Sequence, residues 1–235
     1  MNATAHPAGE ARPEQVAEAL RDLARLGGFF ALDTAAPGTP RQGAPADGRG
    51  LREGFAARAR AVNDRFGTAE PRVGVSVAHL GLAARLWSPV LACVLVHGIL
   101  PAMDAAEWAG DGTAVRLNGA RGRLTARLPA PADAVHAEVD GALRNVEDGL
   151  TVKIAPGLLA GNSASALVGS AAQLQRTLPA LRAPLGRLTR DLLRTGRLRG
   201  TGRITGPGPA FRRNSCCLLY RAPGGGTCGD CCLTG

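Results

Sequence analysis

The sequence predicts an α+β protein that is predominantly helical, with a small antiparallel sheet and a cysteine-rich C-terminal segment. Three observations lead to this fold class. Apolar residues recur at helical spacing along most of the chain, while two short central stretches alternate between apolar and polar residues. Five of the six cysteines fall in the last twenty residues.

The composition is that of a globular chain, and it excludes several protein classes. With 235 residues and a hydrophobic fraction of 45%, the chain can bury a core without disulfide staples. The same composition excludes a collagen, a coiled coil and a small disulfide scaffold. The net charge is +9 and Lys153 is the only lysine. Part of this positive charge can therefore reflect a coding sequence biased toward arginine and not selection for a polyanionic partner.

We expect a cytoplasmic protein without a transmembrane segment. Residues 1–15 are polar and lack the apolar stretch of a signal peptide. The most apolar window, residues 90–100, is shorter than the about 20 residues that a membrane-spanning helix needs. The cysteines gather at one end instead of forming a dispersed disulfide framework, and such a cluster in a reducing compartment usually indicates a metal site.

Helical periodicity and punctuation predict a series of helices. They cover residues 13–26, 52–66, 73–87, 89–100, 133–146, 163–178 and 181–195. Pro13 suits a first helical turn, and Gly67 suits the end of the second helix. Ser88 and Pro89 have the residue types of an N-cap and a first turn, so they predict a new helix there. Residues 33–50, dense in Pro, Gly and Ala, are expected to form a loop.

The central stretch of the chain has strand character. Residues 113–117 and 123–128 alternate apolar and polar side chains, and the intervening Asn118-Gly119 predicts that they pair as a β-hairpin. Residues 151–154 are a further candidate strand, and residues 200–209 read as a Gly/Pro linker. The chain thus divides into an N-terminal helical region (1–70), a core of helices and a hairpin (71–210) and the cysteine-rich segment (211–235).

The cysteines follow the pattern C-C-x10-C-x2-C, formed by Cys216, Cys217, Cys228 and Cys231. Thiolate sulfur selects zinc, copper(I) or iron–sulfur centres. Structural zinc prefers two C-x2-C knuckles, whereas here one half is a vicinal pair, whose side chains point to opposite faces when extended. A two-iron cluster is wider, and the glycines at 224–226 let backbone N–H groups approach its sulfurs. The chemistry favours an iron–sulfur centre and leaves zinc and a redox disulfide open.

This segment closely resembles the C-terminal motif of the FhuF-type ferric-siderophore reductases. The shared features are the vicinal cysteines, the Tyr-Arg-x-Pro-Gly-Gly-Gly run and Cys-Gly-Asp-Cys. Residues 85–90 and 161–166 are also similar to that family. The resemblance implies a 2Fe-2S cluster held by Cys216, Cys217, Cys228 and Cys231. Cys232 is then a fifth thiol, either spare or able to exchange with Cys231.

The resemblance also implies the activity. A reduced cluster would pass single electrons to Fe(III) held by a siderophore, possibly of the hydroxamate type, and iron would leave as Fe(II). No catalytic residue beyond the cluster is required. Two other functions stay open at this point: an iron–sulfur sensor or regulatory binding protein without reductase activity, and a structural zinc tail on a siderophore-related protein.

Several residues outside the cysteines have two interpretations each. A group of arginines precedes or enters the motif: Arg176, Arg182, Arg187, Arg190, Arg194, Arg197, Arg199, Arg203, Arg212 and Arg213. They form either solvated helix faces or a surface that attracts an acidic electron donor, such as a ferredoxin or flavodoxin. Because no aromatics are interleaved with them, nucleic acid is not an expected partner. Asn162 either caps a helix starting at Ser163 or holds a loop near the cluster. Trp87 and Trp108 either line a substrate surface or, as we expect, pack in the core, and His79 is expected in the core or at its edge.

Overall fold

The computed structural model describes residues 9–35, 50–109, 113–206 and 208–234. Within these residues the α-helices are α1 (Pro13–Ala24), α2 (Leu51–Phe66), α3 (Pro71–Ala92), α4 (Pro131–Glu147), α5 (Pro156–Thr177) and α6 (Arg182–Leu192). The strands are β1 (Asp33–Ala35), β2 (Ile99–Pro101), β3 (Ala106–Ala109), β4 (Ala114–Asn118), β5 (Gly122–Leu124), β6 (Gly202–Ile204) and β7 (Phe211–Arg213). The 3-10 turns are Gly28–Phe30, Thr125–Arg127, Pro179–Leu181, Gly196–Leu198 and Leu219–Arg221, and Cys93–His97 is a π-helical turn. The predicted helical α+β class with a small antiparallel sheet is confirmed.

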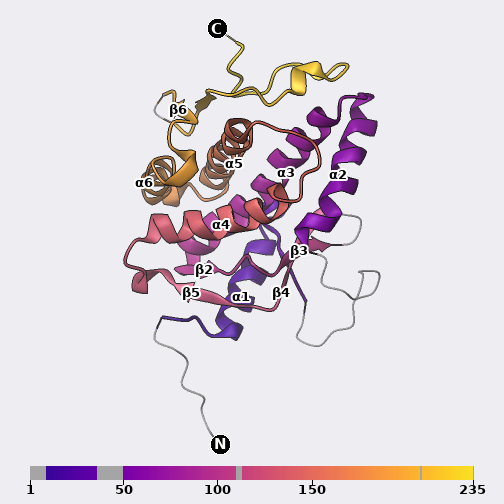
Figure 1. The fold of residues 1–235 in the computed structure, drawn as a ribbon. Coiled ribbons are helices and arrows are strands. Elements are labelled where there is room, and N and C mark those ends of the chain that lie inside the picture. The colour runs from indigo at the N-terminus through magenta and orange to yellow at the C-terminus, as the bar shows by residue number, and fades with distance from the viewer. Residues whose placement is uncertain (1–8, 36–49, 110–112, 207, 235) are drawn as a thin grey trace, which may run out of the picture.

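Helix α3 lies at the centre of the molecule, with α2 on one side and α5 on the other (Figure 1). Most of its side chains are buried, because neighbouring elements cover it on several sides. α4 and α6 complete the helical layers, and α1 and the β1–β5 strands lie at the end of the molecule far from the C-terminus (Figure 1). The result is a helical frame built around one long apolar helix.

The predicted break at Ser88-Pro89 is wrong, because α3 runs through both residues to Ala92. Ser88 does not cap a helix. Its hydroxyl forms a 2.8 Å hydrogen bond with Ser170 Oγ of α5. A proline inside a helix removes one backbone hydrogen bond, and here the buried contacts on both sides of Pro89 keep the helix continuous.

The apolar helix is also longer than the 90–100 window suggested. Residues 71–97 are long and apolar enough, by length and composition, to cross a membrane. Of the most apolar stretch in this helix, however, 61% is buried inside the molecule. A helix covered in this way is what the centre of a folded core requires.

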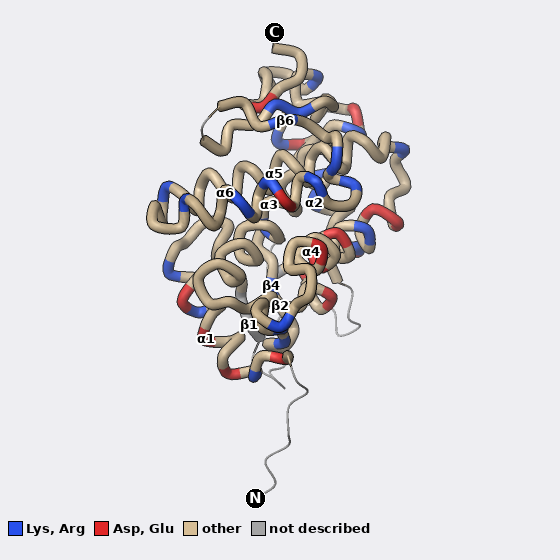
Figure 2. The backbone as a smooth tube through the Cα atoms, turned by 90° about the vertical axis from the view of Figure 1, so that its left-hand side faces the viewer, with Lys and Arg blue, Asp and Glu red and all other residues tan. Residues whose placement is uncertain are grey.

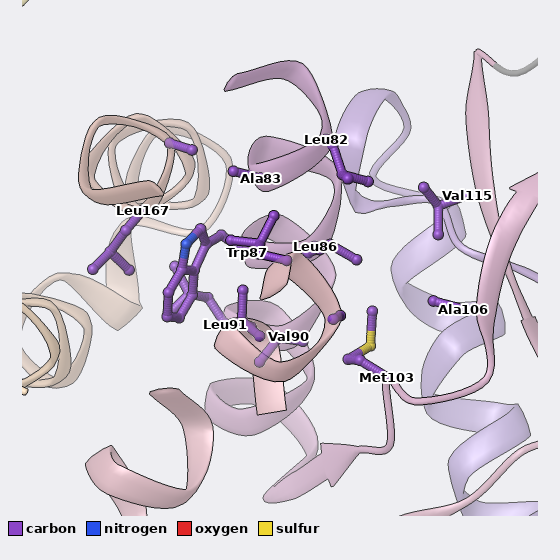
Figure 3. Close-up of a cluster of buried hydrophobic side chains, with 14 of the residues drawn as sticks. Leu82, Ala83, Leu86, Trp87, Val90, Leu91, Met103, Ala106, Val115 and Leu167 are labelled. Carbon is purple, nitrogen blue, oxygen red and sulfur yellow. The ribbon is translucent and has the colours of Figure 1, made fainter. Parts of the chain in front are cut away.

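The hydrophobic core gathers around the middle of α3 (Figure 3). Trp87 is 1% exposed, points toward α5 and Leu167, and donates a 3.0 Å hydrogen bond from Nε1 to Ser163 Oγ. On the other side of α3, Leu82 and Leu86 face Val115 of β4. Core members run from Ala11 to Phe211, and the division of the chain at residues 70 and 210 stays a prediction.

The strands pair differently from the predicted hairpin, which is wrong. β4 pairs antiparallel with β3 and parallel with β1, while β5 pairs antiparallel with β2. Asn118 and Gly119 do end β4, and Gly119 has a positive φ of 87°. The chain therefore bends at Gly119, but it passes into a second sheet instead of folding β5 back onto β4 as a hairpin.

Other boundaries also differ from the prediction. Helix α5 starts at Pro156, before the expected position, and residues 151–154 form no strand. The expected linker at 200–209 contains β6, which pairs antiparallel with β7. The expected loop at 33–50 begins with β1, and its residues 36–49 lie outside the described residues. The helices expected at 13–26, 52–66 and 181–195 form with small shifts at their ends.

Candidate metal centre

The C-terminal segment crosses one end of the helical frame. In Figure 1 it is the yellow chain that passes over α5 and α3, at the end of the molecule opposite the N-terminus. β7 contacts α5, and the turn at Leu219–Arg221 contacts α3. The cysteine motif is therefore seated on the two helices that contain the other stretches with family resemblance, residues 85–90 and 161–166.

A buried polar contact fixes the vicinal cysteines to α3. Ser76, which is 0% exposed, donates a 2.7 Å hydrogen bond from its hydroxyl to the backbone carbonyl of Cys217. Asn162 of α5 donates from Nδ2 to the Ser76 carbonyl at 2.9 Å and to Ser76 Oγ at 3.2 Å. One serine thus joins α3, α5 and the C-terminal segment.

Arg213 enters the same network from β7. Its Nη2 donates to Asn162 Oδ1 at 2.7 Å and, at 3.4 Å each, to the Leu158 carbonyl and Ser215 Oγ. Gly161 makes room for this approach, because a Cβ at that position would overlap with Ser215 Oγ. α5 therefore presents a small residue and an amide where the segment comes closest.

The C-x2-C half of the motif is anchored separately. The carboxylate of Asp230 accepts a short hydrogen bond from Ser165 Oγ of α5, and the Asp230 carbonyl accepts a 3.1 Å bond from the Arg213 backbone N–H. The Cys231 N–H donates at 3.1 Å to the Cys228 carbonyl, which closes the turn. Asp230, to which the sequence assigned no role, ties this turn to the frame.

The glycine run lets the chain turn back between the two halves of the motif. Gly224 and Gly226 have positive φ values of 68° and 57°, a region that favours glycine. Gly225 approaches the Leu219 carbonyl so closely that a Cβ would overlap with it. These glycines shape the loop that returns the chain from Cys217 to Cys228.

The sulfur atoms bring the two halves of the motif together. Cys217 Sγ and Cys228 Sγ are 3.5 Å apart, close to the about 3.8 Å expected of two thiolates on one tetrahedral metal with metal–sulfur bonds of about 2.3 Å. Cys217 and Cys231 are buried, while Cys216, Cys228 and Cys232 are half-buried. Across the described ranges, no three His, Cys, Asp or Glu side chains converge closely enough to hold one metal ion.

Burial affects the ionisation of two thiols of the motif. Burial raises the pKa of the Cys216 thiol. Burial, followed by the neighbouring Cys217 and Asp230, raises the pKa of Cys228 well above its ordinary value. Crowded thiols of this kind resist becoming thiolates alone, but a bound metal cation deprotonates them. Raised pKa values of this kind do not distinguish one metal from another, so they leave the nature of the centre to other evidence.

The other residues singled out in the sequence are placed as follows. Asn162 lies inside α5, so the capping interpretation is wrong. Its amide bonds Arg213 of β7 and Ser76 of α3, and a loop held near the cluster stays a prediction. Trp108 is partly buried against the core and donates a 2.8 Å hydrogen bond to the Leu51 carbonyl, and Trp87 is in the core. His79 is fully buried beside Glu147, with Nε2 and Oε1 2.8 Å apart.

Sequence reasoning missed Ser76, Ser165 and Arg213 as parts of this centre. Ser76 is a small polar residue within an apolar helix, and Ser165 lies in a stretch of similar small residues. Arg213 was one arginine among ten in a basic stretch. Only the tertiary packing of α3, α5 and β7 distinguishes these three from their neighbours.

Comparison with known proteins agrees with this location. Residues 213–233 match the family model described as the FhuF 2Fe-2S C-terminal domain. No protein of curated function and no solved structure matches the chain. The FhuF-type resemblance and the 2Fe-2S cofactor are thus confirmed for the C-terminal segment. The assignment of individual cysteine ligands stays a prediction.

Proposed function

We propose that this protein, whose C-terminal segment is an FhuF-type 2Fe-2S domain, reduces iron(III) bound to siderophores and thereby releases iron(II). The observation that carries the proposal is the position of the cysteine motif, on an outer segment with half-buried Cys216 and Cys228. Tyr220 and Leu233 of the same segment are 47% and 56% exposed. A bulky chelate can approach such a segment without entering a deep pocket.

The reaction transfers one electron. When bound, the cluster supplies a one-electron reductant for Fe(III), and the product is Fe(II). Hard oxygen donors such as hydroxamates hold Fe(III) far better than Fe(II), so reduction loosens the chelate. The chain's own residues hold the four thiols in place, exclude bulk water from Cys217 and Cys231, and leave one side of the segment open to the substrate. No proton transfer or nucleophile is needed.

The chain also offers a basic surface for an acidic electron donor. Arg182, Arg187 and Arg190 of α6 line a cavity of about 470 Å³ beside the residues that connect β6 and β7. None of these three arginines has an acidic partner among the described residues, and blue segments recur along α6 in Figure 2. An acidic protein of the ferredoxin or flavodoxin class is the partner that this surface favours. We place the protein in the cytoplasm, where thiols stay reduced.

The proposal is tested by iron release. Anaerobically purified protein is reduced with dithionite, freed of excess reductant and mixed with a ferric hydroxamate and a chromogenic iron(II) chelator. We expect iron(II) in proportion to the oxidised cluster, and none from Cys228→Ser, whereas Cys93→Ser should match wild type. A cluster that reduces and reoxidises in air but delivers no electron to the chelate would contradict the reductase and favour a sensor.

A further inference from the structure

Arg213 is a buried cation that no carboxylate neutralises. It is 1% exposed, and its three hydrogen-bond acceptors are uncharged: Asn162 Oδ1, the Leu158 carbonyl and Ser215 Oγ. Its Nε and Nη1 are also buried and have no hydrogen-bond partner within the described ranges. In the part of the chain that the structure describes, no acidic side chain lies within ion-pairing distance of this guanidinium.

An arrangement of this kind is costly in a folded protein. A buried charge loses its hydration, and the lost free energy returns only when a counter-charge or a full set of hydrogen bonds replaces the water. Here one of the three guanidinium nitrogens is bonded to protein acceptors, and the other two are not. An anionic partner close to Arg213 would offset this cost.

The position of Arg213 points to that partner. Its Nη2 contacts Ser215, the residue before Cys216, and its backbone N–H bonds the carbonyl of Asp230, the residue before Cys231. Arg213 therefore contacts the residue before Cys216 and the residue before Cys231, and so links the two halves of the cysteine motif. Through Asn162 and Ser76 it is also linked to the Cys217 carbonyl.

The proposed cofactor carries the missing negative charge. Two ferric ions, two sulfides and four thiolates sum to two net negative charges, and one-electron reduction makes three. We propose that Arg213 is the internal counter-charge of the cluster, stabilising the reduced form and so raising its reduction potential. This inference rests on the 2Fe-2S cofactor of the proposed function. Arg213 is a positioning residue in this reaction, since it acts on the potential and not on the substrate.

Burial on the Arg213 side of the motif should strengthen the effect. Coulomb interactions grow as the effective dielectric falls, and both Arg213 and Cys217 are buried. The one electron that reduction adds to the cluster would then be stabilised by this cation. Hydrogen bonds and charge near the sulfurs are established means by which a protein tunes such clusters.

The test measures the reduction potential of the intact protein. Arg213→Gln removes the charge, and Arg213→Lys keeps it. Arg203→Gln, an exposed residue of β6 on the same hairpin, is the matched control for the loss of one charge. Potentials come from EPR-monitored titrations, and circular dichroism checks the fold. We expect Arg213→Gln to lower the equilibrium constant for reduction tenfold or more, where one factor of ten is about 59 mV for one electron.

The other variants should separate charge from shape. The equilibrium constants for reduction of Arg213→Lys and Arg203→Gln should stay within tenfold of the wild-type value. A potential for Arg213→Gln equal to that of Arg203→Gln would overturn the inference, and so would an equal fall in Arg213→Lys. If Arg213→Gln holds no cluster, the Asn162→Asp variant tests the inference instead. It keeps the guanidinium of Arg213 and places a carboxylate against it, which offsets the positive charge. We expect a lower potential there, and an unchanged one would overturn the inference. A wild-type protein without iron would instead refute the proposed function.

Discussion

The hydroxyl of Ser76 donates a 2.7 Å hydrogen bond to the backbone carbonyl of Cys217, which is 141 positions further along the chain. This bond joins the central helix α3 to the vicinal half of the cysteine motif. The same serine accepts a hydrogen bond from Asn162 of α5, so the motif is held by both long helices. The cysteine motif is thereby tied to the packing of the helical frame.

Replacing Ser76 should loosen the cluster more than it destabilises the fold. Ser76→Ala leaves the Cys217 carbonyl without its partner and removes one acceptor of Asn162, a loss of about 1–2 kcal/mol. We expect faster iron release to a chelator, measured by the decay of visible absorbance. Ser88→Ala is the matched control, since it removes another buried hydroxyl of α3, bonded to Ser170 and not to the motif. Equal release rates in the two variants would contradict the anchoring role.

Gly161 should tolerate no side chain. Gly161→Ala puts a methyl group into Ser215 Oγ, so the segment cannot seat on α5, and we expect protein that folds but retains less than half of its iron. Gly169→Ala, on the same helix with open space around it, should keep the cluster and gain about 0.5–1 kcal/mol of stability. Adding Ser215→Ala should restore iron to Gly161→Ala. If the single variant binds iron as wild type does, the close approach is unimportant.

The six cysteines should divide into two groups by iron content. Serine at Cys216, Cys217, Cys228 or Cys231 should abolish the visible absorbance of the cluster. Serine at Cys232 or Cys93 should leave it intact. Burial raises the pKa of Cys93 to about 12, so alkylation of the folded protein at neutral pH should also leave this thiol unmodified.

Variants of Cys232, the fifth thiol of the motif, test whether Cys216, Cys217, Cys228 and Cys231 are the four ligands. If Cys231→Ser keeps its iron while a double replacement of Cys231 and Cys232 loses it, the two cysteines exchange as ligands. Should Cys232→Ser alone lose the cluster, the assignment of four ligands is wrong.

Glu147 should make the fold sensitive to acid. Burial alone would raise its pKa, but hydrogen bonds and charge from His79 and Arg197 lower it to about 2 from an ordinary 4.5. The stability that this carboxylate contributes is therefore complete above about pH 4.5 and disappears as the pH falls toward about 2. At pH 7 we expect Glu147→Gln to lower the free energy of unfolding by about 3 kcal/mol at most.

The measurement is urea denaturation of a Cys228→Ser background, so that acid release of iron does not contribute. The difference in free energy of unfolding between the protein with Glu147 and the Glu147→Gln variant should become smaller from pH 7 to pH 3. Asp148→Asn removes the adjacent exposed acid and serves as the control. A difference that does not change with pH would show that the ion pair contributes no pH-dependent stability.

The sequence allowed prediction of the features that depend on local spacing. The cysteine pattern lies within sixteen residues. Its chemistry favours an iron–sulfur centre over zinc or a disulfide, and its resemblance to the FhuF-type motif implies the 2Fe-2S cluster without any knowledge of the fold. The C-terminal end of α2 was predicted because glycine is the residue type that terminates helices in the left-handed conformation, and Gly67 has a φ of 59°. Both signals are read from neighbouring residues alone.

Features that depend on distant partners could not be predicted in this way. Asn118-Gly119 indicates a turn but does not say which strands flank it, and the Gly110-Asp111-Gly112 that follows β3 is an equally good hairpin signal. Ser88-Pro89 has the residue types of a helix start, yet burial against α5 overrides them. Ser76, Asn162 and Arg213 acquire their roles only where α3, α5 and β7 meet.

The most direct test of the account is EPR spectroscopy of anaerobically purified protein after reduction with dithionite, before and after a ferric hydroxamate is added. We predict a signal from the unpaired electron of a reduced 2Fe-2S cluster, which disappears when the chelate accepts that electron. No signal, together with zinc in the elemental analysis, would contradict the iron–sulfur assignment. A signal that persists with the chelate would contradict the reductase.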